Sequence, residues 1–556
     1  MKKSFFIIFV FLSCFFPKAQ NEFITIWKPS NTQNTFTHNP PYASSTTQIW
    51  APFRGNNFTI YWEENGYPTH NVTLTNVTSS TQVLLDFGTA QNPNANAATY
   101  TVKVSNGNGN FHQIMFRDAT LGTSNSTMGD TAKMIDISQW GNIHWSAMEN
   151  AFAGCNNLNI TATDIPDLSS VNNLNGTFLG CNSLIGNNSI NNWNISSVNS
   201  LVSTFSSCSI FNQPLNNWNT SNVTYMENTF HLAKAFNQPL SNWDTSNVID
   251  MTAMFNNAQS FNQPLDNWNV SSNTDCEFMF SNAWAFNQPL NNWNVSNVVL
   301  FQNMFNRALA FNSNISEWNT SGAVNMSGMF QYTPAFNQNI SSWNTSNVTI
   351  MSSMFQNATA FNQNIGNWNT SHVTTMVNMF NDATSFNQNL GSWNLSSLLY
   401  ASSIFNNSGL NCQNYDSTLY GWRLNPLTPN NISISNASPM IYSHTAAVAA
   451  RNFLISNKGW SISGDSYNPT CVSALSIDEA SILSPPQIYP NPATDFIYLK
   501  NFKALESFKI FDYSGRILMQ NIFKNYEIDI RMLKKGNYIL QLKTKNAIES
   551  FKFIKK

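Results

Sequence analysis

The stretch FNQPLNNWNTSNVTYMENTF, residues 211–230, returns as FNQPLSNWDTSNVIDMTAMF at 236–255 and as FNQPLDNWNVSSNTDCEFMF at 261–280. Its aromatic positions recur every 25 residues through eight copies, and the first two copies place them at Phe211, Trp218, Phe230, Phe236, Trp243 and Phe255. A fixed period of this length is typical of stacked coils, which bury their apolar side chains against one another. We therefore predict that these rings form the core of a repeat array over residues 134–409, in which degenerate copies come first.

Two apolar spacings within one copy predict two kinds of local structure. The part up to the tryptophan, which contains Pro214, favours a short extended segment and a bend. The part after it has apolar residues three and four positions apart, which favours a short helix capped by Ser221 or Thr220. The apolar residues of this predicted helix are Val223, Met226, Phe230 and Ala233. The predicted fold class is an α/β solenoid, leucine-rich-repeat-like, with 25-residue coils of short strand plus short helix.

Asparagine and tryptophan each recur at fixed positions of the repeat, and each such column of residues has two interpretations. Asparagines recur in the slots of Asn212 and Asn219. They favour a structural ladder that satisfies backbone groups where the chain turns, and a row that binds a ligand or a cation is the alternative. The tryptophan column favours a buried core, and an exposed stripe that stacks on sugars is the alternative.

Composition and the N-terminus limit the class of protein. Charged residues make up 10% of the chain, the net charge is -2, and aromatic residues make up 13%. This balance favours neither nucleic-acid binding nor disorder. Lys2 and Lys3 precede an apolar run over residues 5–16, so residues 1–19 are predicted to be a secretory signal peptide. A lipoprotein signal with Cys14 as the lipidated residue is the alternative. We expect no transmembrane segment after signal removal.

The regions on either side of the array differ from it. Residues 21–118 alternate apolar and polar residues between turn signals, which predicts an all-β domain of the immunoglobulin-like kind. Residues 410–472 are expected to cap the last coil, and residues 473–486 to form a linker. Residues 487–556 are predicted to be a small β-sandwich. From Pro485 onward, 13 Lys and Arg stand against 6 Asp and Glu.

No motif in the chain is typical of a catalytic site. The seven His residues form neither HExxH nor another zinc spacing, and the chain has no GxSxG and no phosphate-binding glycine loop. The carboxylates of the array show no repeated pairing of the kind that glycosidases use; they include Glu227, Asp250, Asp275 and Glu317. We therefore expect a protein that is not an enzyme, with no catalytic residue, metal site or cofactor.

The cysteines divide into two groups. Cys155, Cys181 and Cys208 occupy the slot that alanine fills in later copies. They are interpreted as small core residues, and a disulfide between two of them would leave one over. Cys412 and Cys471 lie at the two ends of the predicted cap, and a bridge between them in an oxidising compartment is a hypothesis.

The repeat resembles a known family. The pattern FNQxLxxWxTSxVxxMxxMFxxA, followed closely by FNQNISSWNTSNVTIMSSMFQNA at 336–358, is similar to the BspA-like leucine-rich repeat of bacterial surface proteins. NYDSTLYGW at 414–422 and AARNFLISNKGWSI at 449–462 resemble a block that often follows such repeats. The resemblance implies a surface-exposed protein that adheres to proteins or cells.

The C-terminal segment resembles the type A C-terminal sorting domain of the type IX secretion system. The likeness is carried by YPNP at 489–492, SGR at 514–516 and GNYILQL at 536–542. The residues assigned to this sorting motif are Tyr489, Pro490, Asn491, Pro492, Gly515 and Gly536. The resemblance implies the type IX secretion machinery as a partner, export across both membranes of a Gram-negative cell, and removal of the domain. The product is then secreted or anchored at the outer cell surface.

These observations predict a secreted cell-surface repeat protein that binds an extracellular partner through an extended solenoid surface. The expected role is adhesion or recognition, with a protein or a glycan as the unidentified ligand and no nucleic acid. A carbohydrate-binding surface protein for nutrient capture is one alternative. A structural spacer that holds another module away from the surface is the other.

Overall fold

The computed structural model describes residues 21–32, 43–118, 128–473, 475, 487–500, 502, 505–522, 527–544 and 548–556. The chain forms two compact units: Met1–Ser443 with Ala447–Val472, and His444–Ala446 with Ser473–Lys556. The predicted signal peptide and nearly all of the predicted linker lie outside the described residues. None of the helices in the described ranges is long and apolar enough to cross a bilayer.

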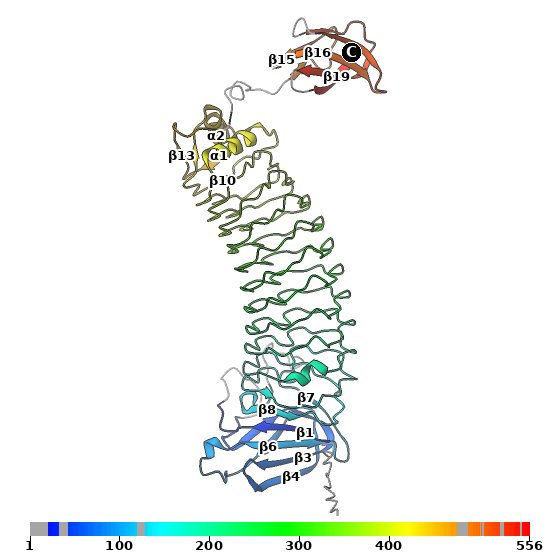
Figure 1. The fold of residues 1–556 in the computed structure, drawn as a ribbon, viewed down its shortest axis with the longest axis vertical. Helices are drawn as coiled ribbons and strands as arrows, with labels where there is room; N and C mark the ends of the chain where they lie inside the picture. The colour runs from blue at the N-terminus through cyan, green and yellow to red at the C-terminus, as the bar shows by residue number, and fades with distance from the viewer. Residues whose placement is uncertain are drawn as a thin grey trace, which may run out of the picture. The chain divides into compact units, whose positions relative to one another are not determined.

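The first unit opens with a seven-stranded sheet in the order β4-β3-β6-β1-β8-β9, with β7 paired to β3 (Figure 1). Its strands are β1 Phe23–Trp27, β3 Phe53–Glu64, β4 Tyr67–Ser79, β6 Tyr100–Ser105, β7 Asn110–Ile114, β8 Met134–Gln139 and β9 Asn159–Ile160. A second, two-stranded sheet pairs β2 Gln48–Ala51 with β5 Val83–Asp86. Burial alternates along β6, as the apolar–polar alternation of its sequence predicts. Single 3₁₀ turns lie at Ala95–Ala97 (η1) and Thr131–Lys133 (η3).

Strand β8 joins this sheet to the coils. It pairs antiparallel with β1 on one edge and parallel with β9 on the other. Because β9 belongs to the next turn of the chain, the sheet ends where the stacking of coils begins. One continuous cluster of buried apolar residues accordingly extends from Phe23 in the sheet to Ile462 in the cap.

The prediction of an α/β coil with a helix in each repeat is wrong. Among the described residues the α-helices are α1 Cys412–Leu424 and α2 Thr445–Lys458, and both follow the coils. In the segment predicted to be helical, the Met226 N–H donates to the Asp250 carbonyl oxygen of the next coil at 3.0 Å. Asn228 donates in the same way to Thr252 at 2.9 Å. Further along the segment, the N–H groups of Thr229, His231 and Ala233 close turns within the coil.

The reason lies in the backbone dihedrals. Asn228 and Leu232 have φ of 54° and 60°, and the equivalent positions of later coils are also left-handed. A helix cannot include such residues, because every one of its residues needs a negative φ. A series of turns that alternates right-handed and left-handed residues still returns every third or fourth side chain to the same side. The apolar spacing therefore suits both structures.

The predicted short strand is also misplaced. Residues 211–218 form no strand, and the contact between coils is a parallel bridge of one residue, such as Tyr225 with Asp250. Such bridges continue coil by coil to Tyr400. The inter-coil pairing therefore falls in the segment predicted to be helical. One 3₁₀ turn, η4 Asn188–Asn192, interrupts the early coils.

Buried rings hold successive coils together. The six aromatic residues named from the first two copies are all buried. Rings of adjacent coils stack with centroid separations of 6.1 Å for Phe211 and Phe236, 6.2 Å for Trp218 and Trp243, and 5.6 Å for Phe230 and Phe255. Each ring buries a large apolar area against the next coil. A single coil would therefore leave its rings exposed to water.

The tryptophan column lies in the core, and the interpretation as a sugar-stacking stripe is wrong for it. The Trp218 indole N–H donates to the carbonyl oxygen of Ile190 at 2.8 Å, and the Trp243 indole donates to that of Leu215 at 2.9 Å. A buried indole N–H needs such an acceptor, and the preceding coil supplies it.

The two asparagine slots do different work. The Asn212 side-chain oxygen accepts the N–H of Asn237 on the next coil at 2.9 Å, and the amide of Gln238 at 3.2 Å. This pattern repeats along the array, so the first slot forms a ladder between coils. The Asn219 oxygen instead accepts the Ser221 N–H of its own coil at 3.1 Å, which closes a local turn.

The cap ends both the tryptophan column and the asparagine ladder. It consists of α1, α2 and two small parallel pairs, β10 Ser433–Ile434 with β12 Ser461–Ile462, and β11 Ile441–Tyr442 with β13 Ser466–Tyr467. The Trp422 indole donates to the Leu390 carbonyl oxygen at 2.9 Å, as a last member of the tryptophan column. The Asn411 N–H donates to the Asn387 side chain at 2.9 Å, at the end of the asparagine ladder. The last coil therefore leaves neither row unpaired.

The second unit contains two antiparallel sheets, β14-β15-β18 and β17-β16-β19-β20. Its strands are β14 Gln487–Tyr489, β15 Phe496–Lys500, β16 Leu505–Asp512, β17 Ile517–Ile522, β18 Glu527–Asp529, β19 Gly536–Thr544 and β20 Ile548–Lys555. A separate apolar cluster, which includes Ile497, Ile510 and Leu540, fills its core.

Candidate binding face of the array

One outward-facing part of the coils combines acidic and apolar side chains. Along the bridged positions, Tyr225, Asp250, Asp275 and Leu300 follow one another as consecutive rungs of the parallel ladder. Together with the acidic and apolar residues one or two positions away in sequence, they form a surface that we name the bridge face. Its residues are Tyr225, Glu227, Ile249, Asp250, Asp275, Glu277, Val299 and Leu300.

The carboxylates of the bridge face disfavour one another's ionised form. Burial, and then the charges of Asp250 and Asp275, raise the pKa of Glu227 above its ordinary value. Burial, with the same two charges, raises the pKa of Glu277. Burial also raises the pKa of Asp275, and the Asp250 charge acts in the same direction. A cation placed among these groups would relieve both the repulsion and the lost solvation.

Apolar side chains flank these carboxylates and stay accessible. Tyr225 is 43% exposed, Ile249 40% and Val299 37%. Scattered exposed apolar residues need no explanation, but these three lie within one coil of a bridge-face carboxylate. The aliphatic part of a lysine or arginine side chain could cover them while its charged end reaches the carboxylates.

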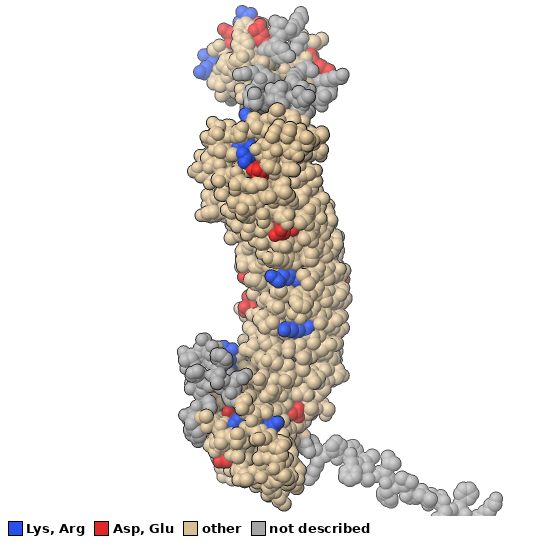
Figure 2. Space-filling view, turned by 90° about the vertical axis from the view of Figure 1, so that its left-hand side faces the viewer, with Lys and Arg blue, Asp and Glu red and all other residues tan. Residues whose placement is uncertain are grey.

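The array carries far more negative charge than positive charge. Residues 134–409 hold 12 Asp and Glu but only Lys234 and Arg307 as cations, a net charge of -10. Figure 2 shows one side of the coils, where charged residues are few among the others. In the described part of the chain, ion pairs form in the N-terminal sheet, the first coils, the cap and the second unit, and not on the bridge face.

A second surface feature, which we name the Trp284 ridge, lies along the positions that follow the bridge face in each coil. It consists of Trp284, Arg307, Leu309 and Tyr332. Trp284 and Leu309 are each 45% exposed, and the Arg307 guanidinium lies 4.6 Å from the centre of the Tyr332 ring. Arg307 and Tyr332 have φ of 57° and 54°, at a position where most coils place the better-suited asparagine or aspartate. Bulky residues held in this conformation are commonly found at functional surfaces.

The structure brings together only some of the carboxylates considered in the sequence. Glu227, Asp250 and Asp275 meet on the bridge face, whereas Glu317 lies on a different part of its coil. Glu277 was missed, although its 25-residue frame places it two positions after Asp275, as Glu227 lies two after Tyr225. Within the described ranges no group of three His, Cys, Asp or Glu is arranged to hold a metal ion.

The sorting-motif residues lie in the second unit, at strand ends and turns. Tyr489 ends β14, and Pro490, Asn491 and Pro492 follow it. The Asn491 side chain donates to the Lys552 carbonyl oxygen at 3.1 Å and accepts the Ile554 N–H at 3.0 Å, so this segment runs beside β20.

The two glycines of the motif have separate places. Gly515 turns the chain between β16 and β17 with φ of 83°, which glycine adopts at little cost. In that turn the Asp512 carboxylate accepts the N–H groups of Ser514 and Arg516, each at 3.0 Å. Gly536 begins β19.

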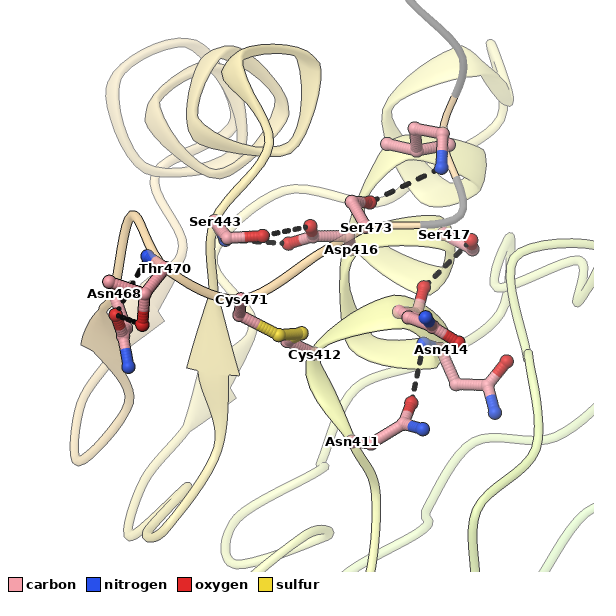
Figure 3. Close-up of a disulfide and its surroundings, with 12 residues drawn as sticks. Asn411, Cys412, Asn414, Asp416, Ser417, Ser443, Asn468, Thr470, Cys471 and Ser473 are labelled. Atoms are coloured by element: carbon pink, nitrogen blue, oxygen red, sulfur yellow. Dashed lines mark hydrogen bonds between the residues drawn. A yellow bond between two sulfur atoms is a disulfide. The ribbon is translucent and has the colours of Figure 1, made fainter.

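The hypothesis of a bridge between Cys412 and Cys471 is confirmed (Figure 3). The other cysteines of the described residues are free and buried. Cys181 and Cys208 donate their thiols to the carbonyl oxygens of Phe152 and Phe178. Burial raises the pKa of these thiols, so they are unreactive core residues.

Comparison with known proteins finds one family in the coils and another in the C-terminal segment. Residues 146–248, 238–342 and 310–422 match the family described as "Mycoplasma protein of unknown function, DUF285". Residues 487–556 match the family described as "Secretion system C-terminal sorting domain". A search of curated proteins found no match. The sorting domain indicates export by type IX secretion to the cell surface or the extracellular space. The resemblance of the coils to BspA-like leucine-rich repeats stays a prediction.

Proposed function

We propose that this exported repeat protein is an adhesion or recognition protein, similar in role to BspA-like surface proteins, and that it binds an extracellular protein through the bridge face. The single observation that supports this most is the group of four carboxylates, set among exposed apolar side chains and without cations of their own. A surface of this kind is costly for the folded protein unless a partner uses it.

The chemistry of the bridge face selects the kind of partner. An array with a net charge of -10 attracts cationic proteins and repels anionic ones at long range. At contact, Lys and Arg side chains match both the carboxylates and the apolar flanks. The proposed partner is therefore a cationic segment of a host, neighbouring-cell or matrix protein. The proposal includes no catalysis.

Binding of the full chain to immobilised polylysine and polyglutamate tests this proposal. We expect binding to polylysine only, and we expect it to weaken as salt rises, because exposed charges are screened. The variant Asp250→Asn with Asp275→Asn should lose most of the binding. The matched control, Asp266→Asn with Glu317→Gln, removes the same charge elsewhere on the array and should bind as the parent does. Equal loss in both variants would show a general effect of net charge and would contradict a dedicated face.

Carbohydrate binding is a second candidate, and one observation favours it. The tryptophan column is buried, but Trp284 is 45% exposed on the array surface, where an aromatic ring could contact a sugar. Binding to a glycan array that disappears with Trp284→Ala and survives the Asp250→Asn, Asp275→Asn change would favour this candidate over the first. A chain that binds neither probe would favour a spacer.

A further inference from the structure

The cap contains a segment that ties the end of the first unit back to its last coil. We name residues 459–472 the exit strap, because they are the last residues of the first unit before the chain continues toward the sorting domain. The exit strap contains β12 and β13, which pair with β10 and β11. Any tension on the C-terminal side of the protein enters the first unit here.

One tie of the exit strap is covalent. Cys471 is bridged to Cys412, which precedes it by 59 residues, and their Cα atoms are 6.5 Å apart (Figure 3). Cys412 is the first residue of α1, directly after Asn411. The bridge therefore joins the penultimate residue of the exit strap to the point where the coils end.

The receiving end of this bridge is itself fixed to the last coil. The Asn411 N–H donates to the Asn387 side-chain oxygen at 2.9 Å. Asn414 donates to the same oxygen at 2.9 Å and to the Asn387 main-chain oxygen at 2.8 Å. A pull on Cys412 is thus transmitted to the asparagine ladder that links one coil to the next.

A second, non-covalent tie holds the base of the exit strap. The Asp465 carboxylate is fully buried and accepts two hydrogen bonds from the Arg451 guanidinium of α2, each at 2.7 Å. The Tyr415 hydroxyl of α1 donates to the same carboxylate at 2.9 Å. The strap is therefore attached to both cap helices, but these contacts lie inside the loop that the disulfide closes.

We propose that the Cys412–Cys471 bridge is a mechanical clamp, which passes tension from the C-terminal side of the chain directly into the coil stack. With the bridge intact, force that arrives at residue 472 crosses to Cys412 and reaches the coils without loading residues 413–470. Without it, the same force must run through the exit strap, α2 and α1 in turn, and would pull the cap apart first. A surface protein held by one end while its array holds a partner would gain a cap that stays folded under tension.

The chain between the two bridged cysteines is long enough for its release to be measured as an extension step. Opening a separation of 59 residues from 6.5 Å to an extended chain of about 3.5 Å per residue releases about 200 Å. Peeling off one 25-residue coil releases only about 90 Å by the same measure. The two events are therefore distinguishable in one experiment.

Single-molecule pulling of the full chain by its two ends tests the clamp. We expect the oxidised protein to show coil-sized steps without a step of about 200 Å from the cap. Reduction of the parent protein, and the variant Cys471→Ser without reductant, should each add that step at a force below that of the coil steps. Reductant should change nothing further in Cys471→Ser, because the remaining array thiols are free. Steps from the second unit occur in every arm.

Two outcomes would overturn the proposal. One is a cap step of the full length in the oxidised parent, which would mean that force does not cross the bridge. The other is the absence of the step after reduction and in Cys471→Ser, which would mean that the cap resists tension without it. Neither outcome depends on which partner the array binds, so the clamp and the proposed function can fail separately.

Discussion

Replacing Trp293 with alanine removes a ring from the middle of the tryptophan column. Its indole lies between those of Trp268 and Trp318, at centroid distances of 6.5 Å and 6.4 Å, and donates to the Leu265 carbonyl oxygen at 2.8 Å. Truncating a buried tryptophan costs about 3–5 kcal/mol. The Leu265 carbonyl oxygen keeps the Trp268 N–H at 3.1 Å and loses only the indole, so the lost hydrogen bond adds about 0.5–1.5 kcal/mol. We expect the free energy of unfolding to fall by about 3.5–6.5 kcal/mol.

Urea unfolding followed by far-UV circular dichroism measures this loss. The matched control is Trp284→Ala, nine residues earlier in the same array, where the indole is 45% exposed. Its loss should stay below about 1.5 kcal/mol, because nearly half of the side chain is already exposed to water. The variant Trp293→Phe keeps most of the apolar area and isolates the indole hydrogen bond, so it should cost about 0.5–1.5 kcal/mol. Equal destabilisation by the two alanine variants would refute the reasoning that the column is core.

Three further predictions concern the cap, the asparagine ladder and the bridge face. Cys471→Ser should lower the free energy of unfolding of the cap by about 4 kcal/mol, as expected for opening a loop of about 60 residues. Calorimetry with and without reductant measures this loss of stability. A loss no larger than that of a surface substitution would contradict the prediction. Asn262→Ala should cost about 1–3 kcal/mol in urea unfolding, because it leaves the N–H of Asn287 on the next coil without its acceptor, whereas Asn294→Ala, which opens only a local turn, should cost less. Asp275→Asn should stabilise the protein at pH 7, because the raised pKa of Asp275 means that its ionised form destabilises the fold. In urea unfolding at several pH values, this gain should disappear as pH falls through the pKa of Asp275. A gain in stability that persists in acid would show another cause.

The sequence revealed the stacking period and the buried columns because both follow from fixed spacing. Phe211, Trp218 and their counterparts recur at one interval, and only side chains buried in register between coils need that regularity. The asparagine ladder could be proposed for the same reason. Neither inference required knowledge of the local backbone.

The local structure of the coil could not be predicted in this way. A spacing of three and four residues returns Val223, Met226 and Phe230 to one side in a helix, and it does so equally in a series of turns. The difference depends on left-handed residues such as Asn228, and asparagine only permits that conformation without requiring it. The frequent asparagines predict hydrogen-bonded turns, but they do not identify which of them adopt a positive φ.

The bridge face was hidden for a related reason. Asp250 and Asp275 are 25 residues apart, which places them on neighbouring coils. Whether they point outward depends on which residues of the coil face the core, and the helical interpretation assigned that incorrectly. Once the bridged positions are known, the charges and exposed apolar residues beside them form one surface.

Intrinsic fluorescence of the Trp284→Phe variant tests the central claim most directly. Every tryptophan of the chain lies among the described residues, and all except Trp284 are buried. The buried aromatic stack predicts blue-shifted emission that acrylamide does not quench, and a shift to red, quenchable emission only on unfolding. Emission from water-exposed indoles in the folded variant would contradict the stack of coils on which the binding face and the clamp both depend.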